Sequence, residues 1–124
     1  MTWKIEHQRF ENIVRLTADG PISSTDVLAQ VMQGVALIRQ HSIPGALADY
    51  SNAVLEMPTE EIVLLPDLLD ELAAPKSTRM AIALPSDPAN MHKYTFFDDV
   101  ATQRGYQVRL FWEPSRAMEW IMGK

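Results

Sequence analysis

The stretch LADYSN, residues 47 to 52, places an acid and a hydroxyl two residues apart, and a histidine occurs later in the chain. Asp49, Ser51 and His92 are the residue types of a hydrolase in which a histidine takes the serine proton and a carboxylate orients the histidine. The chain has no GxSxG motif, the sharp turn that holds the serine of many such enzymes. A hydrolase at this stretch therefore requires that folding bring the three side chains together.

Other residue types suit metal or acid–base chemistry. The histidines at 7, 41 and 92 lack HxH or HExxH spacing, and there is no cysteine. Acidic clusters occur at Glu60-Glu61, Asp67-Asp70-Glu71 and Asp98-Asp99. They fall on polar faces or first turns of expected helices, where solvated carboxylates complement the helix dipole. No glycine-rich phosphate loop is present. We therefore expect no catalytic residue, no metal ligand, no cofactor and no enzymatic activity.

Composition limits the classes of partner. The 124 residues carry a net charge of −5, and the basic residues are scattered, so we expect no nucleic-acid partner. No apolar run approaches the roughly 18 residues of a membrane span, and the N-terminus has no apolar leader core. The length corresponds to one domain, residues 1–124. The expected location is the cytoplasm.

The first half of the chain changes from strand to helix patterns. Apolar and polar residues alternate over 3–7 and 13–18, which predicts a hairpin with one solvated face. The tripeptide DGP at 19–21 is expected to end the second strand. Residues 24–41 then repeat apolar positions every three to four residues, which predicts a helix capped by Ser23 or Ser24.

The second half predicts a layered sheet. Residues 46–49 and 80–84 are short, continuously apolar runs, as in strands buried on both faces. Helical patterns follow each of them, and a strand in YQVRLFW precedes a last short helix opened by Pro114. Strands alternating with helices predict an α/β fold with a mainly parallel sheet of about five strands, opened by the hairpin and covered by helices.

The expected helix over 59–74 has more apolar surface than one sheet contact needs. Its apolar residues cover an arc of roughly 180°, against about 100° for a helix on one face of a sheet. Pro66 should kink or split it. The surplus indicates either a deeply buried helix or an apolar face for a homodimer partner or an apolar ligand. The candidate interface residues are Leu64, Leu65, Leu68 and Leu69.

The stretches VRLF at 108–111 and RAMEWI at 116–121, with ALADYS at 46–51, are similar to packing patterns of a known family. Together with the strand and helix over 79–105, they resemble small bacterial proteins of the SpoIIAA-like group, placed with the STAS and Sec14-like domains. The resemblance covers nearly the whole chain. It implies a right-handed β/α superhelix of the SpoIIAA or STAS type.

The resemblance also implies a role and a region. STAS anti-sigma-factor antagonists carry a phosphorylated serine in an Asp-Ser-Ser-Gly-like stretch after the buried strand. Here that region reads LEMPTEE, and Thr59 is the nearest hydroxyl, so phosphorylation is expected to be weak or absent. The candidate interaction rim is Asp49, Tyr50, Ser51, Asn52 and Thr59. Substitutions at Tyr50 and Ser51 are expected to change partner binding with little effect on stability.

Three functions remain open from the sequence. The first is a non-enzymatic regulatory module that binds a partner protein, as the STAS resemblance implies. The second is a binding module for a small apolar or lipid-like ligand, as the Sec14 side of the resemblance implies. The third is a hydrolase at the LADYSN stretch. A cavity, a convergent triad or a flat apolar patch would distinguish them.

Overall fold

The computed structural model describes residues 2–123. The elements, in chain order, are β1 (Trp3–Gln8), β2 (Ile13–Ile22), α1 (Ser24–His41), β3 (Gly45–Leu55), α2 (Thr59–Ile62), α3 (Leu65–Glu71), β4 (Arg79–Ala83), the 3₁₀ turn η1 (Pro88–Asn90), α4 (Met91–Gln103), β5 (Gln107–Phe111) and α5 (Pro114–Ile121). This order confirms the predicted alternation of strands and helices. The predicted initial hairpin is also present.

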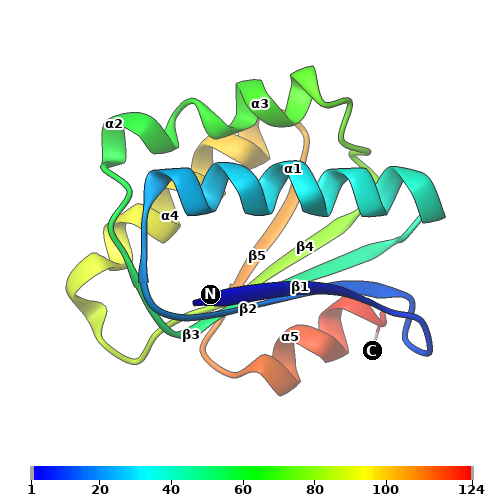
Figure 1. Cartoon of the computed structure of the whole chain (residues 1–124), viewed down its shortest axis with the longest axis horizontal. Helices are drawn as coiled ribbons and strands as arrows, with labels where there is room; N and C mark the ends of the chain where they lie inside the picture. The colour runs from blue at the N-terminus through cyan, green and yellow to red at the C-terminus, as the bar shows by residue number, and fades with distance from the viewer. Residues whose placement is uncertain (1, 124) are drawn as a thin grey trace.

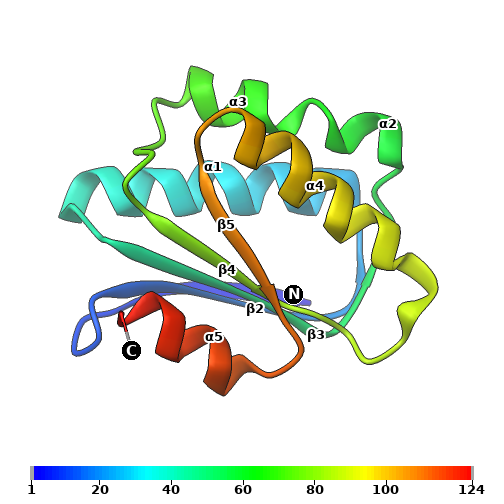
Figure 2. The same cartoon turned by 180° about the vertical axis from the view of Figure 1, so that it is seen from behind.

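The five strands form one mixed sheet in the order β1-β2-β3-β4-β5. The β1–β2 pair is antiparallel, and the remaining pairs are parallel. Helices α1, α2, α3 and α4 cover one face of this sheet, and α5 covers the other (Figures 1 and 2). The central strands are therefore buried on both faces, as their continuous apolar runs predicted.

Helix α1 begins where the sequence predicts. Ser23 is the N-cap, and its side chain and the carboxylate of Asp26 form a reciprocal capping box. Val27, Val35 and Ile38 are buried toward the sheet. Of the other residues of the apolar stripe, Leu28 and Met32 lie on the outer side and are 42% and 54% exposed.

The expected strand end at DGP is wrong. Strand β2 continues through Gly20 and Pro21, and Pro21 pairs with Val54 of β3. In the described part of the chain β1 pairs with β2 only as far as Ala18, so the last residues of β2 lie at a sheet edge. A proline is tolerated at an edge because its missing N–H breaks no ladder hydrogen bond there. Gly20 adopts a positive φ of 71° at this point.

The helix expected over 59–74 is split. α2 ends at Ile62, and α3 starts at Leu65 with Pro66 in its first turn, where a proline fits. The expected apolar interface is consequently smaller than predicted. Leu65 and Leu69 lie in the core at 7% and 4% exposed, so they are not surface residues. Leu64 is exposed, and Leu68 is half-buried.

The opposite face of the sheet depends on α5. Ala117 of this helix is fully buried against β3 and β4, within the cluster that contains Leu47 and Ala83. Arg79 joins β4 to the end of α5 by donating to the backbone oxygen of Trp120 at 2.7 Å. The guanidinium also lies over the Trp120 ring. One short helix therefore closes this side of the molecule.

The second buried strand shows one departure from expectation. Leu84, which follows β4, is buried as predicted, but Ile82 is only partly buried. Its side chain lines a cavity under the helices rather than filling the core. The sequence also predicts Asp87 as the N-cap of the next helix, with Pro88 in its first turn, but α4 begins at Met91. Asp87 instead accepts a hydrogen bond from the backbone N–H of Ala89 in the preceding 3₁₀ turn.

Candidate functional site

The candidate rim does not lie where a strand ends. Asp49 pairs with Thr17 of β2 and with Ala83, the last residue of β4, and β3 then continues with β2 alone to Leu55. The pairing register shifts between Thr17 and Asp19. Tyr50 and Ser51 therefore stand opposite a single residue of β2, which makes a β-bulge. Bulges often occur beside functional sites because they redirect side chains.

The bulge places Asp49 and Ser51 in contact with each other. Both the backbone N–H and the hydroxyl of Ser51 donate to Oδ1 of Asp49, at 3.0 and 2.6 Å. In a Ser-His-Asp arrangement the serine hydroxyl would face a histidine. Among residues 2–123, no hydrogen bond joins the His92 side chain to either residue. This arrangement is a local turn motif.

Tyr50 points away from the surface. Only 7% of it is exposed, and its hydroxyl donates to Oε1 of Gln30 in α1. Its ring meets that of Tyr94 in α4 edge to face, with the centroids 6.0 Å apart. Tyr50 therefore belongs to the core and cannot be a rim contact residue.

The remaining rim residues reach solvent. Asn52 is exposed, and Asp49, Ser51 and Thr59 are half-buried. Thr59 is the first residue of α2 and follows the N-cap Pro58. Hereafter the rim means Asp49, Ser51, Asn52 and Thr59. It lies at the end of the sheet opposite the β1–β2 turn, as the path of β3 shows (Figure 1).

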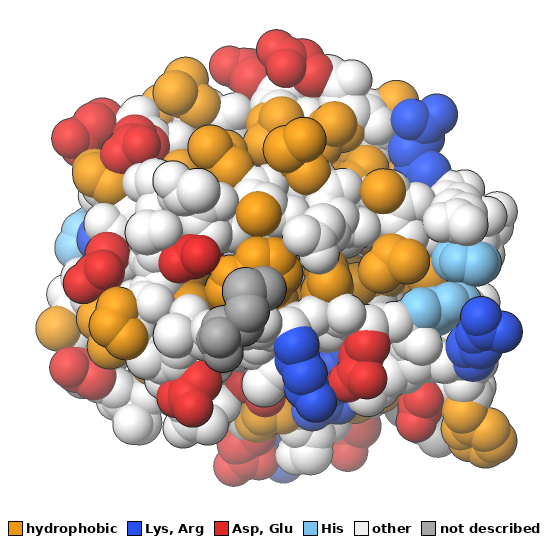
Figure 3. Space-filling model, viewed as in Figure 1, with side chains coloured by type: hydrophobic (Ala, Val, Ile, Leu, Met, Phe, Trp, Pro, Cys, Tyr) orange, Lys and Arg blue, Asp and Glu red, His pale blue; other side chains and the backbone are white. Residues whose placement is uncertain are grey.

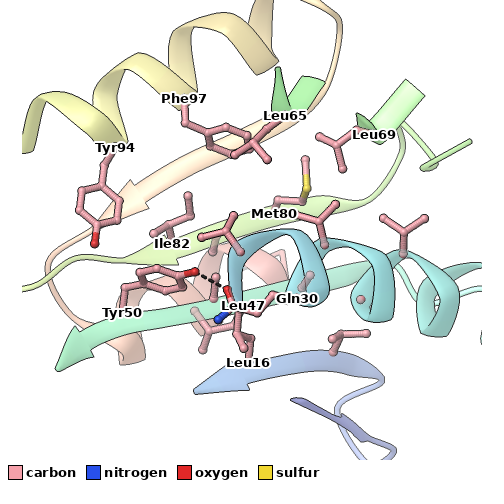
Figure 4. A pocket seen from close by; sticks show the side chains of 18 of the residues that line it. Leu16, Gln30, Leu47, Tyr50, Leu65, Leu69, Met80, Ile82, Tyr94 and Phe97 are labelled. Atoms are coloured by element: carbon pink, nitrogen blue, oxygen red, sulfur yellow. Dashed lines mark hydrogen bonds between the residues drawn. The ribbon is translucent and has the colours of Figure 1, made fainter. Parts of the chain in front are cut away.

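A second candidate site lies inside the molecule. A cavity of about 180 Å³ separates the helix-covered face of the sheet from helices α1 to α4. Its walls are almost entirely apolar, and Leu16, Leu65, Leu69, Ile82 and Phe97 are among them. In Figure 4, Tyr50, Gln30 and Tyr94 gather at one end of the cavity, and Leu69 lies at the other.

The polar end of the cavity has unused hydrogen-bonding capacity. Within the described residues, the amide nitrogen Nε2 of Gln30 and the hydroxyl of Tyr94 are buried without a hydrogen-bond partner. Burial raises the pKa of Tyr94 to about 12. Burial likewise raises the pKa of Tyr50 above its ordinary value. Both phenols therefore keep their protons at neutral pH and remain able to donate.

Sequence reasoning missed this cavity, although one feature indicates it. Gln30 stands between Val27 and Gly34 on the buried side of α1, where a helix stripe should be apolar. A buried amide needs partners, because an unpaired one costs about 1–3 kcal/mol. Such a polar residue inside an apolar stripe marks a polar contact in the core. Lys93 and Tyr94 of α4 also line the cavity, but no comparable sequence pattern indicates a buried position for them.

Two other polar clusters join residues that are far apart in sequence. Arg104 contacts Asp67 and Asp70 at 2.5 and 2.8 Å, and the Tyr106 hydroxyl donates to Asp70 at 2.6 Å. His7 and His41, far apart in sequence, have ring centroids 4.8 Å apart. Within the described chain, no group of three or more histidines, cysteines or acids is placed to hold a metal ion.

Comparisons with known structures identify the fold of this chain. No protein-family model matches the chain, and no curated protein matches it. The unphosphorylated anti-sigma factor antagonist SpoIIAA superposes with a TM-score of 0.59 and 16% identity, covering 98% of this chain and 99% of that one. The phosphorylated form of the Bacillus cell-fate determinant SpoIIAA superposes with a TM-score of 0.56 and 12% identity, covering 96% of this chain and 98% of that one.

A third structure is an uncharacterised DUF3478-family protein from Shewanella loihica with a SpoIIAA-like fold. It gives a TM-score of 0.57 and 19% identity, covering 96% of this chain and 91% of that one. The chain therefore has the SpoIIAA-like (STAS) fold, and the fold that the resemblance implied is confirmed. In the part that the structure describes, no helix is long and apolar enough to span a bilayer.

Proposed function

We propose that this chain is a non-enzymatic regulatory module that acts by binding a partner protein through the rim. The observation that carries the proposal is the match over nearly the full length of both chains to the anti-sigma factor antagonist SpoIIAA. The bulge in β3 supports it, since Asp49 and Ser51 are fixed by hydrogen bonds beside the exposed Asn52. A fixed polar surface loses little conformational entropy on binding.

The proposal treats residues 1–124 as a single domain that works in the cytoplasm of a bacterium. One five-stranded sheet, to which nearly all the described elements belong or against which they pack, supports the domain assignment. The absence of cysteine from the sequence suits a reducing compartment. A phosphoswitch is not part of the proposal. Glu60 and Glu61 directly follow Thr59, and they would repel a phosphoryl group on its hydroxyl.

We also infer that the chain forms a homodimer through an apolar face on α1 and the α2–α3 segment. Leu28, Met32, Val63 and Leu64 are exposed there, and Leu64 is 58% exposed. Hydrophobic side chains gather along α1 and toward α3 in the space-filling view (Figure 3). A contiguous apolar patch of this kind favours association.

The partner-binding proposal can be tested by site-specific crosslinking. A photoreactive phenylalanine analogue replaces Asn52 at the rim or, as a control, Phe10 in the exposed turn between β1 and β2. We expect one protein to crosslink from position 52 and not from position 10. With that protein purified, Asn52→Arg and Thr59→Arg should raise the Kd at least roughly tenfold, and Phe10→Arg should leave it unchanged. Equal effects at both ends would contradict the proposal.

A second candidate function is the binding of a small, largely apolar molecule. The cavity of about 180 Å³ beneath α1 favours it, because ligand sites are concave and mostly apolar with a few placed polar groups. The buried, unpaired amide of Gln30 is such a group. Partner binding and ligand binding use separate parts of the molecule, so one chain can do both.

A further inference from the structure

The size of the cavity limits the ligand. Engineered apolar cavities of about 150 Å³ bind benzene, and this cavity measures about 180 Å³. A ring-sized molecule with a short substituent fits within it, whereas a long acyl chain would extend beyond it. The walls come from the sheet and from helices α1 to α4, and the apolar residues that line them offer no polar partner to most of the ligand.

The polar end of the cavity determines which functional group the ligand carries. Gln30 is 4% exposed, and its Oε1 accepts a hydrogen bond from the Tyr50 hydroxyl. This hydrogen bond sets the orientation of the amide and leaves the Nε2 hydrogens as donors without a partner. A ligand placed here must therefore supply an acceptor.

A carbonyl oxygen is the acceptor that fits best. It has two lone pairs and no hydrogen of its own. A ligand hydroxyl could also accept from Gln30 and donate to the Tyr94 oxygen, but the hydrogen of the Tyr94 hydroxyl would then be left without an acceptor. A carboxylate would carry its charge into the same apolar surroundings, at a cost in desolvation. Lys93, a cation at the wall, uses one of its three N–H groups on the backbone oxygen of Leu55 at 3.1 Å, so benzoate is included as a third probe.

We infer that the cavity binds a neutral, ring-sized apolar molecule bearing one carbonyl oxygen, which accepts a hydrogen bond from Nε2 of Gln30. The inference rests on the second candidate function, since it names the ligand class of that cavity. It assigns Gln30 as the residue that selects the functional group. Tyr50 is a positioning residue, because it acts on the ligand only through the orientation of the Gln30 amide.

The test uses two probes of the same shape. Acetophenone carries the carbonyl, and α-methylstyrene has a CH₂ group in place of the oxygen. Their Kd values are measured by titration of the ¹⁵N-labelled protein followed by NMR, for wild type, Gln30→Met and Gln33→Met. The last variant is a matched control, because Gln33 is an exposed glutamine on the same helix.

We expect both probes to bind wild type, and Gln30→Met to weaken acetophenone about tenfold relative to α-methylstyrene. Gln33→Met should leave that ratio unchanged. If Gln30→Met does not fold, infrared spectra of acetophenone bound to wild type still show whether its carbonyl accepts a hydrogen bond. A carbonyl stretch below its value in an alkane solvent supports the hydrogen bond, and an unshifted stretch overturns it.

The outcomes separate the two levels of the inference. If neither probe binds, the second candidate function itself is wrong. If both probes bind and Gln30→Met leaves the ratio of their Kd values unchanged, ligand binding is supported and the carbonyl assignment is overturned. Tighter binding of benzoate than of acetophenone would also overturn it, because the preferred ligand would then be an anion.

Discussion

The Tyr50 hydroxyl makes a buried hydrogen bond that the sequence pattern did not predict. From its sequence neighbours, Tyr50 is a surface residue beside an acid and a serine. In the fold, strand alternation places it on the same face of β3 as Ala46 and Ala48, under the helices, where it pairs with Gln30. Its neighbours Asp49 and Ser51 bond to each other instead.

Tyr50→Ala should therefore destabilise the protein, by about 3–5 kcal/mol, because it removes a buried aromatic ring and leaves the Gln30 oxygen unpaired. Asn52→Ala, two residues away and exposed, should change stability by less than about 0.5 kcal/mol. Urea denaturation of both variants measures the difference. Equal midpoints would place Tyr50 on the surface and restore the original expectation for the rim.

Gly45 marks the closest approach between β3 and α5. A Cβ at this position would lie 2.2 Å from Cγ2 of Ile121, a branched side chain at the end of α5. Gly45→Ala should cost about 1–3 kcal/mol through overpacking. Gly34→Ala is the control, because its Cβ would meet Ile5 at an ordinary 3.5 Å and alanine favours a helix. Chemical denaturation should show a loss of stability for Gly45→Ala and none for Gly34→Ala.

At the scale of elements, two contacts hold the helices to the sheet. On one face, α3 is joined to the end of α4 and the start of β5 through Asp70, Arg104 and Tyr106. On the other, α5 is joined to β4 through Arg79. Neither contact links residues near in sequence, so both form only when the sheet has assembled.

The Asp70 contact predicts a pH dependence. Hydrogen bonds from the Tyr106 hydroxyl and from Arg104 hold the pKa of the Asp70 carboxyl below its ordinary 3.8. The folded pKa lies below the unfolded one, so the contribution to stability is present above pH 3.8. It is lost as the pH falls through the folded pKa. Asp70→Asn and Tyr106→Phe should each flatten the loss of stability between about pH 5 and 2. Urea midpoints across this range measure it, and an unchanged slope in Asp70→Asn would contradict it.

Removal of residues 114–124 should abolish cooperative thermal unfolding. The deletion uncovers Leu47, Ala81 and Ala83 on the face that α5 covers, and buried apolar area stabilises by about 25 cal/mol per Å². Ser115→Ala, an exposed change on the same helix, should melt like wild type. A truncated protein with wild-type melting would show that α5 is dispensable.

At the scale of the whole molecule, the apolar face on α1 and α2–α3 should set the oligomeric state. Light scattering at tens of micromolar should give a mass near twice 14.0 kDa. Met32→Glu and Leu64→Glu should shift the protein to a monomer, because a buried unpaired carboxylate is costly. Phe10→Glu, at a side chain 98% exposed outside this face, should leave the dimer intact. A wild-type monomer would contradict the proposal.

The sequence by itself determined the elements and most of their order. Period-two alternation predicted the β1–β2 hairpin, the capped stripe after Ser23 predicted α1, and Pro66 predicted the division of α2 from α3. These features are local, because side-chain periodicity, capping and proline geometry act within a few residues. Continuous apolar runs also predicted that β3 and β4 would be covered on both faces.

Only the tertiary structure decided where strands end and which side chains face inward. β2 passes through Gly20 and Pro21 because β3 pairs with it there, and the bulge at Tyr50 arises from the register between those two strands. The cavity depends on side chains from the sheet and four helices, so no single segment encodes it. Gln30 joins Tyr50 across 20 residues of sequence, and such pairings follow from packing between elements, which local patterns do not specify.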